Sequence, residues 1–155
     1  MNLTPQIEYR KQQTYAAIKT KLKRDQIQTI LPPLIPELFN WLEKKNLEPS
    51  GPPFFSYLKM EDEQMTVKVG IPVDDDFSPD DRVERDMFPD GKYAVLIYTG
   101  NYRNLYKVND EFEKWAAQNN IEFRGPRTEF YPSDPDAEPD SKKWKTIIVN
   151  QIIDK

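Results

Sequence analysis

The sequence predicts an α+β fold in which a strand–helix–strand–strand unit occurs twice within a single domain, residues 1–155. Three observations lead to this prediction. The length of 155 residues suits one compact domain. A set of residues recurs in the same order in the second half of the chain. In that half, a β-rich run is followed by apolar residues at helical spacing.

The recurring residues lie 74 positions apart in the sequence. The matched pairs are Trp41 and Trp115, Asn46 and Asn120, Gly51 and Gly125, and Tyr57 and Tyr131. Chance rarely reproduces such a series in order, so we interpret it as a duplication. The first repeat is expected over about residues 5–73 and the second over about residues 83–153, with an acidic connector over about residues 74–82 between them.

The elements of the second repeat follow from its residue pattern. After the turn residues Pro89-Asp90-Gly91, residues 92–99 form a β-rich run that predicts a strand. Apolar residues three and four positions apart predict a helix over 103–119, followed by a turn. Two further strands are expected at 127–131 and 144–152.

The first repeat follows the same plan. Strands are expected at 15–21, 54–60 and 66–73, the last two joined as a hairpin across Glu61-Asp62-Glu63. A helix is expected through Leu34, Leu38 and Trp41, with the prolines before and at position 36 in its first turn, where proline is tolerated. A separate short helix at 25–31 stays open.

The composition excludes several kinds of chemistry. The sequence contains neither cysteine nor histidine, so disulfides, thiol nucleophiles and imidazole bases are excluded. The net charge of −4 argues against direct nucleic-acid binding. A calcium loop starting at Asp74 would require glycine and glutamate where Pro79 and Arg85 stand. We expect no metal and no cofactor. Since no apolar run approaches a membrane span and no secretion signal is evident, we expect a cytoplasmic protein without membrane contact.

An ordered set of short motifs resembles the GyrI-like small-molecule-binding domain, the effector-binding module also fused to DNA-binding domains in AraC-type and MerR-type multidrug regulators. The motifs are Pro89-Asp90-Gly91-Lys92-Tyr93-Ala94-Val95-Leu96, Gly100-Asn101-Tyr102, a helix with Phe112 and Trp115, Gly125-Pro126, Glu129-Phe130-Tyr131 and Asp134-Pro135, with Gly51-Pro52-Pro53-Phe54 and Tyr57 in the first half. The first repeat departs from the pattern, because Lys21-Leu22-Lys23-Arg24 stands where Gly-x-Tyr is expected.

The resemblance implies a duplicated β-α-β-β unit with pseudo-twofold symmetry, an antiparallel sheet and two main helices. It further implies an aromatic ligand cavity near the pseudo-axis, in which a glutamate meets lipophilic cationic drugs. Glu129 occupies the matching position. Because the two repeats account for the chain, we expect a stand-alone form without a DNA-binding segment.

Strand alternation places Glu129 and Tyr131 on one face of their strand, and their counterparts Phe55 and Tyr57 likewise. If the two strands lie near each other, three rings and one carboxylate converge, which suits a flat cation. Further candidate ligand contacts are Trp41, Tyr98 and Tyr102. Two alternatives stay open: Glu129 forms a surface ion pair with a neighbouring arginine, and Trp41 is a core residue.

The leading hypothesis is a stand-alone binding protein for amphipathic, cationic aromatic small molecules, acting as a multidrug sensor or a sequestering protein. A second hypothesis is a hydrolase of cyclopropane-bearing DNA-alkylating toxins, in which Glu129 orients water while Tyr57 or Tyr131 donates a hydrogen bond. A third is a DNA gyrase inhibitor that acts by protein contact through residues 74–90. We favour binding over catalysis, and a protein partner stays open.

Overall fold

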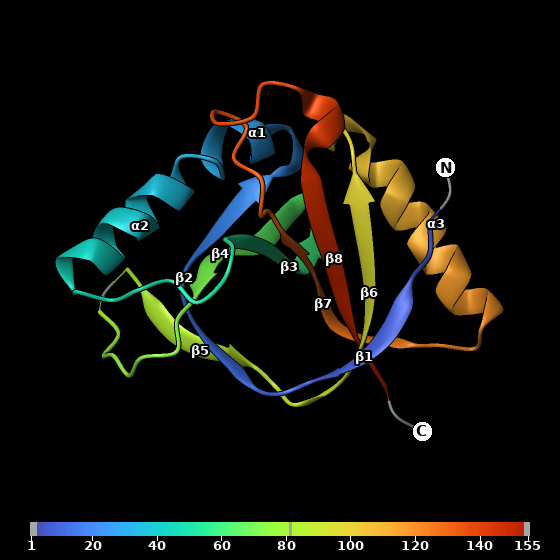
Figure 1. Cartoon of the computed structure of the whole chain (residues 1–155), viewed down its shortest axis with the longest axis horizontal. Helices are drawn as coiled ribbons and strands as arrows, with labels where there is room; N and C mark the ends of the chain where they lie inside the picture. The colour runs from blue at the N-terminus through green and yellow to red at the C-terminus, as the bar shows by residue number, and fades with distance from the viewer. Residues whose placement is uncertain (1–2, 81, 154–155) are drawn as a thin grey trace. The chain divides into compact units, whose positions relative to one another are not determined.

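The computed structural model (Figure 1) describes residues 3–80 and 82–153. These residues form two compact units. Of the described residues, the middle unit comprises 11–80 and 82–90, and the terminal unit comprises 3–10 together with 91–153. Each unit has four antiparallel strands and one main helix, which confirms the predicted α+β class.

The middle unit has the strand order β3-β4-β2-β5, in which all neighbouring strands are antiparallel. Its elements are β2 (Gln13–Lys23), η1 (Arg24–Gln26), α1 (Ile27–Ile30), α2 (Leu34–Lys44), β3 (Phe54–Glu61), β4 (Gln64–Pro72) and β5 (Glu84–Phe88). The predicted hairpin is confirmed, because Glu61 pairs with Gln64 across the turn residues Asp62 and Glu63, both at positive φ.

Helix α2 buries one apolar stripe, consisting of Leu34, Leu38 and Leu42, and it contacts β2 and β4. The apolar face of the sheet includes Val67 and Val69, which are fully buried. The register places Phe55 opposite Val69 and Tyr57 opposite Val67. These two aromatic residues therefore lie on this apolar face of β3, as strand alternation predicts.

The opposite face of the middle unit holds three packed rings and a buried lysine. The ring centroids of Tyr15, Phe54 and Phe88 lie 4.7–5.0 Å apart. Lys68 Nζ lies 2.6 Å from Asp86 Oδ2 and 3.1 Å from the Tyr15 hydroxyl. Burial is the largest single influence and opposes the charged forms of Lys68 and Asp86, but their hydrogen bonds and the attraction of neighbouring opposite charges together outweigh it. The pKa of Lys68 is therefore raised and the pKa of Asp86 lowered.

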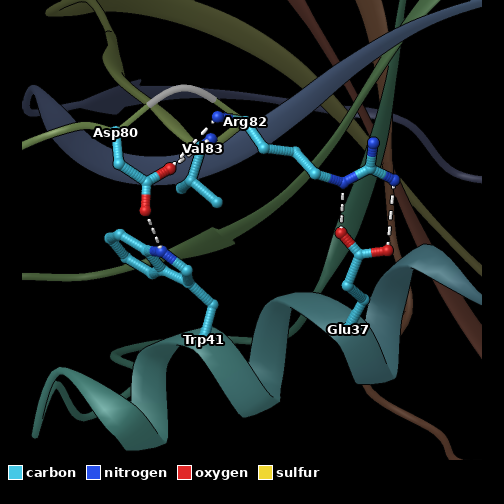
Figure 2. A network of polar contacts seen from close by, with 5 residues as sticks. All are labelled: Glu37, Trp41, Asp80, Arg82 and Val83. Atoms are coloured by element: carbon cyan, nitrogen blue, oxygen red, sulfur yellow. Dashed lines mark hydrogen bonds and ion pairs between the residues drawn. The ribbon is translucent and has the colours of Figure 1, made fainter.

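The acidic segment before β5 is attached to α2 by polar contacts (Figure 2). The indole Nε1 of Trp41 donates to Asp80, which also accepts the backbone N–H groups of Arg82 and Val83. These donors lower the pKa of Asp80, the indole hydrogen bond contributing most. Arg82 forms a two-bond ion pair with Glu37 of α2. The connector is thus bound along the exposed side of the helix.

The terminal unit has the strand order β1-β6-β8-β7, again antiparallel throughout. Its elements are β1 (Gln6–Arg10), β6 (Gly91–Thr99), η2 (Tyr102–Asn104), α3 (Leu105–Gln118), β7 (Phe123–Phe130), η3 (Ser141–Lys143) and β8 (Lys145–Ile152). Val108 and Phe112 of α3 pack with Leu96 of β6 and Ile148 of β8 to form its core. The α3 face of this sheet is therefore the one that carries Leu96 and Ile148.

The two main helices end in the same way. Asn46 after α2 and Asn120 after α3 both have φ of 57°, and each is followed by a hydrogen bond that closes the end of the helix. These bonds run from Leu47 N–H to the Leu42 carbonyl and from Ile121 N–H to the Ala116 carbonyl, at 2.9 and 2.8 Å. Both helix ends thus fall at the positions that the sequence comparison matched.

Some features differ from the expected elements. Strand β1 was not predicted. Strand β7 begins at Phe123 rather than at Arg127, because its register with β8 shifts between Arg124 and Thr128, where Gly125 adopts a φ of 78°. The short helix that the sequence left open at 25–31 is present as η1 followed by α1. None of the helices in the part of the chain that the structure describes is long and apolar enough to span a bilayer.

Candidate functional site

Glu129 is a buried acid at the end of β7. It pairs with Ile148 of β8, so its side chain lies on the α3 face of the terminal unit. Its side chain is only 3% exposed. Such a position requires compensating partners, because an isolated buried carboxylate is strongly unfavourable.

Three side chains provide that compensation. The Tyr131 hydroxyl donates to Glu129 Oε1 at 2.7 Å, and Asn109 Nδ2 of α3 donates to Oε2 at 3.0 Å. Arg127 Nε lies 3.4 Å from the same Oε2, within ion-pair distance, and its side chain is 36% exposed. The predicted arginine contact is therefore present, but the acid is buried rather than on the surface. The carboxylate thus combines fixed neutral donors with one partly exposed cation.

An aromatic row extends from this carboxylate. The ring of Tyr131 packs edge-on against that of Tyr102, with 5.6 Å between the ring centroids. The ring of Tyr102 packs against that of Trp144, with 4.7 Å between their centroids. The Tyr102 hydroxyl lies 3.4 Å from the Ser133 carbonyl, to which it donates. Burial, with a smaller contribution from the charge of Asp134, raises the pKa of Tyr102, so its hydroxyl stays protonated near neutral pH.

Some buried polar atoms in the described part of the terminal unit have no hydrogen-bond partner. Within residues 3–80 and 82–153, neither Asn109 Oδ1 nor Thr146 Oγ1 has a hydrogen-bond partner, although both are buried. Sequence reasoning missed Asn109. Its signal was a polar residue beside Val108 and four positions after Leu105, hence on the apolar stripe of the predicted helix.

The other predicted site residues have different surroundings. Tyr98 is buried in the α3 core, where its hydroxyl donates to the Asn101 carbonyl. Trp41 is half-buried and directs its indole N–H to Asp80 (Figure 2). Phe55 is buried and Tyr57 half-buried in the middle unit. As ligand contacts, these four residues stay predictions. Among the described residues, no group of three acidic side chains is arranged to hold a metal ion.

The comparisons with known proteins identify the family. The model of the GyrI-like small molecule binding domain matches residues 3–152, nearly the whole chain. The chain belongs to the GyrI-like family. No curated protein sequence matches it significantly.

Several solved structures have a similar fold. The EcmrR C-terminal domain matches with a TM-score of 0.84 at 16% identity, over 100% of both chains. In the EcmrR–DNA complex, this chain spans 58% of the EcmrR chain, at 17% identity and a TM-score of 0.83. SAV2435 bound to tetraphenylphosphonium matches with a TM-score of 0.69 at 16% identity, over 99% of this chain and 94% of SAV2435. A hydrolase from Listeria innocua matches with a TM-score of 0.64 at 15% identity, over 96% of this chain and 91% of the hydrolase chain.

Proposed function

We propose that this GyrI-like chain binds amphipathic, cationic aromatic small molecules, as a sensor or a sequestering protein. The Glu129 carboxylate meets the positive charge, and the row of Tyr131, Tyr102 and Trp144 contacts the apolar body of the ligand. The observation that carries this proposal is a buried carboxylate that accepts a hydrogen bond from the hydroxyl of Tyr131, the first residue of an aromatic row. A fold relative bound to tetraphenylphosphonium, a lipophilic cation, supports it.

The energetics favour a cation of this type. The face of an aromatic ring attracts a cation by about 0.5–2 kcal/mol, depending on solvation. A carboxylate removed from water interacts with a charge more strongly than an exposed one does, because less solvent screens it. Few of these contacts are directional, so the site tolerates ligands of different shapes, as a multidrug-binding protein requires. Phe55, Tyr57, Trp41 and Tyr98 stay proposed as further ligand contacts.

Titration with tetraphenylphosphonium, followed by calorimetry, tests the role of the carboxylate. The wild type is expected to bind, and Glu129→Gln is expected to bind at least about tenfold more weakly, since it loses the charge but keeps the shape. Glu113→Gln is the matched control, because it removes the same charge from an exposed position of α3. No binding by the wild type, or equal binding by wild type and Glu129→Gln, would refute the proposal.

We also infer that the two units descend from one duplicated unit with pseudo-twofold symmetry. Their strand orders correspond, because the order β1-β6-β8-β7 of the terminal unit matches the order β5-β2-β4-β3 of the middle unit. The ends of α2 and α3 share the same dihedral angle and hydrogen bond. Superposition of the two units in an experimental structure tests the inference, and a mismatch of these paired elements would contradict it.

A second candidate function is hydrolysis of cyclopropane-bearing DNA-alkylating toxins. The hydrogen bond between the Tyr131 hydroxyl and Glu129 favours it, because such a pair can orient water and donate a proton. A fold relative from Listeria innocua that is described as a hydrolase also favours it. Incubation with such a toxin, followed by mass spectrometry, tests it. Ring opening by the wild type but not by Glu129→Ala is expected, and an unchanged toxin rules it out.

A further inference from the structure

The Asn109 side chain uses only half of its hydrogen-bonding capacity. Its Nδ2 donates to the Leu105 carbonyl at 2.9 Å and to Glu129 Oε2 at 3.0 Å. Both partners accept hydrogen bonds only, so the amide cannot be turned without placing its oxygen against two acceptors. Its Oδ1 therefore points away from Glu129 and, among the described residues, has no partner.

An unpartnered acceptor at this position is costly. Asn109 is only 7% exposed, and a buried amide oxygen without a hydrogen bond destabilises the structure because it has lost its contact with water. A ligand that brings a donor to this atom removes that destabilisation. Oδ1 and Nδ2 share one carbon atom, so Oδ1 and the Glu129 carboxylate are both within reach of one small cationic group.

Arg127 shows what kind of group Glu129 accepts. Its guanidinium, which carries N–H donors, lies at ion-pair distance from Oε2. The Arg127 side chain is 36% exposed and borders solvent, whereas Asn109 is buried and held by its two hydrogen bonds. Removal of Arg127 leaves a position beside Glu129 that an external cation can occupy.

We propose that the site selects cations whose charged nitrogen carries N–H bonds, such as protonated amines, amidiniums or N–H-bearing dyes, over fully substituted cations. One N–H replaces Arg127 at Glu129, and another donates to Asn109 Oδ1. This inference rests on the proposed function, in which Glu129 meets the ligand charge. A fully substituted cation supplies the charge but leaves Oδ1 without a donor, so it binds more weakly than an N–H cation of the same size.

Rhodamine 123 and tetramethylrhodamine methyl ester are suitable probes. They share the xanthylium core, the methyl ester and the charge, but only rhodamine 123 has N–H bonds. The methylated dye is the more apolar of the two, so apolar burial alone predicts the opposite order. Fluorescence anisotropy titration of the wild type is expected to give a Kd for rhodamine 123 about tenfold lower than for the methylated dye.

The variants assign this preference to one atom. Asn109→Leu is expected to bring the ratio of the two Kd values close to one, because Oδ1 is lost. Asn119→Leu, which alters an exposed asparagine just after α3, is expected to keep the wild-type ratio. A ratio that persists in Asn109→Leu would overturn the role of Oδ1. If Asn109→Leu does not fold, as judged by circular dichroism, the wild-type ratio alone decides.

Failure of this inference differs from failure of the proposed function. If the wild type binds both dyes equally and Glu129→Gln weakens both, only the selectivity is overturned. If the wild type fails to bind tetraphenylphosphonium, or binds it no more tightly than Glu129→Gln does, the proposed function itself is refuted.

Discussion

Replacement of Arg127 by glutamine should strengthen the binding of cationic ligands. Arg127 Nε lies 3.4 Å from Glu129 Oε2, so an incoming cation must compete with a charge that the protein already supplies. Arg127→Gln removes that charge while keeping a polar side chain of similar reach. The cation then meets a carboxylate without this competitor.

The expected size of the effect follows from the geometry. At this distance, an effective dielectric constant of about 20 gives a gross Coulomb energy of about 5 kcal/mol. The guanidinium is 36% exposed, so solvent screens it and recovers much of its energy when it leaves. A net gain of about 1 kcal/mol remains, which corresponds to a Kd for tetraphenylphosphonium about fivefold lower.

Two assays check this gain. Calorimetric titration should show tighter binding by Arg127→Gln and no change in Arg124→Gln, which alters an exposed arginine of the same strand. Thermal unfolding should show a lower Tm for ligand-free Arg127→Gln, because a buried carboxylate has lost its counter-charge, and a larger rise in Tm on adding ligand. An unchanged or weaker affinity of Arg127→Gln would refute the reasoning.

Three further predictions concern the middle unit. Gly70→Ala should lower the free energy of unfolding by about 2–3 kcal/mol, because the new Cβ would overlap the Phe54 ring; a Tm equal to that of the wild type would contradict this. Glu63→Gly should raise the free energy of unfolding by about 1 kcal/mol, since residue 63 has a φ of 69°, and urea titration can detect a change of this size; a loss of stability would count against strain in this turn. The hydrogen bond from Lys68 lowers the pKa of Asp86, so its contribution to stability is present above the ordinary aspartate pKa of about 3.9 and is lost as the pH falls through the folded value. Between pH 6 and pH 3, the wild type should therefore lose stability more steeply than Asp86→Asn in urea titrations, and equal slopes would show that the pair contributes nothing.

Most of the fold could be predicted from local patterns. The spacing of Leu105, Val108 and Phe112 determines the buried side of α3, and these residues do pack inward. Strand β1 could not be found in this way. It has five residues, and the side chains of Ile7 and Tyr9 are 53% and 66% exposed, so its apolar residues do not mark a buried face. Its formation depends on pairing with β6, which is distant in the sequence.

The candidate site was predictable to a smaller extent. Strand alternation and the family motifs pointed to Glu129 and Tyr131, whose contact the structure contains. The packing of Trp144 on Tyr102 depends on the path of the proline-rich segment between β7 and β8, which no periodicity determines. The donor role of Asn109 arises only when α3 is packed on the sheet, so it follows from tertiary structure rather than from local sequence.

The central claim is that Glu129 receives the positive charge of a ligand, and a crystal structure of the chain with bound tetraphenylphosphonium tests it most directly. The phosphonium is expected to lie against the Glu129 carboxylate and the rings of Tyr131 and Tyr102, with the Arg127 side chain displaced. A ligand bound elsewhere, with the ion pair between Arg127 and Glu129 intact, would contradict the claim.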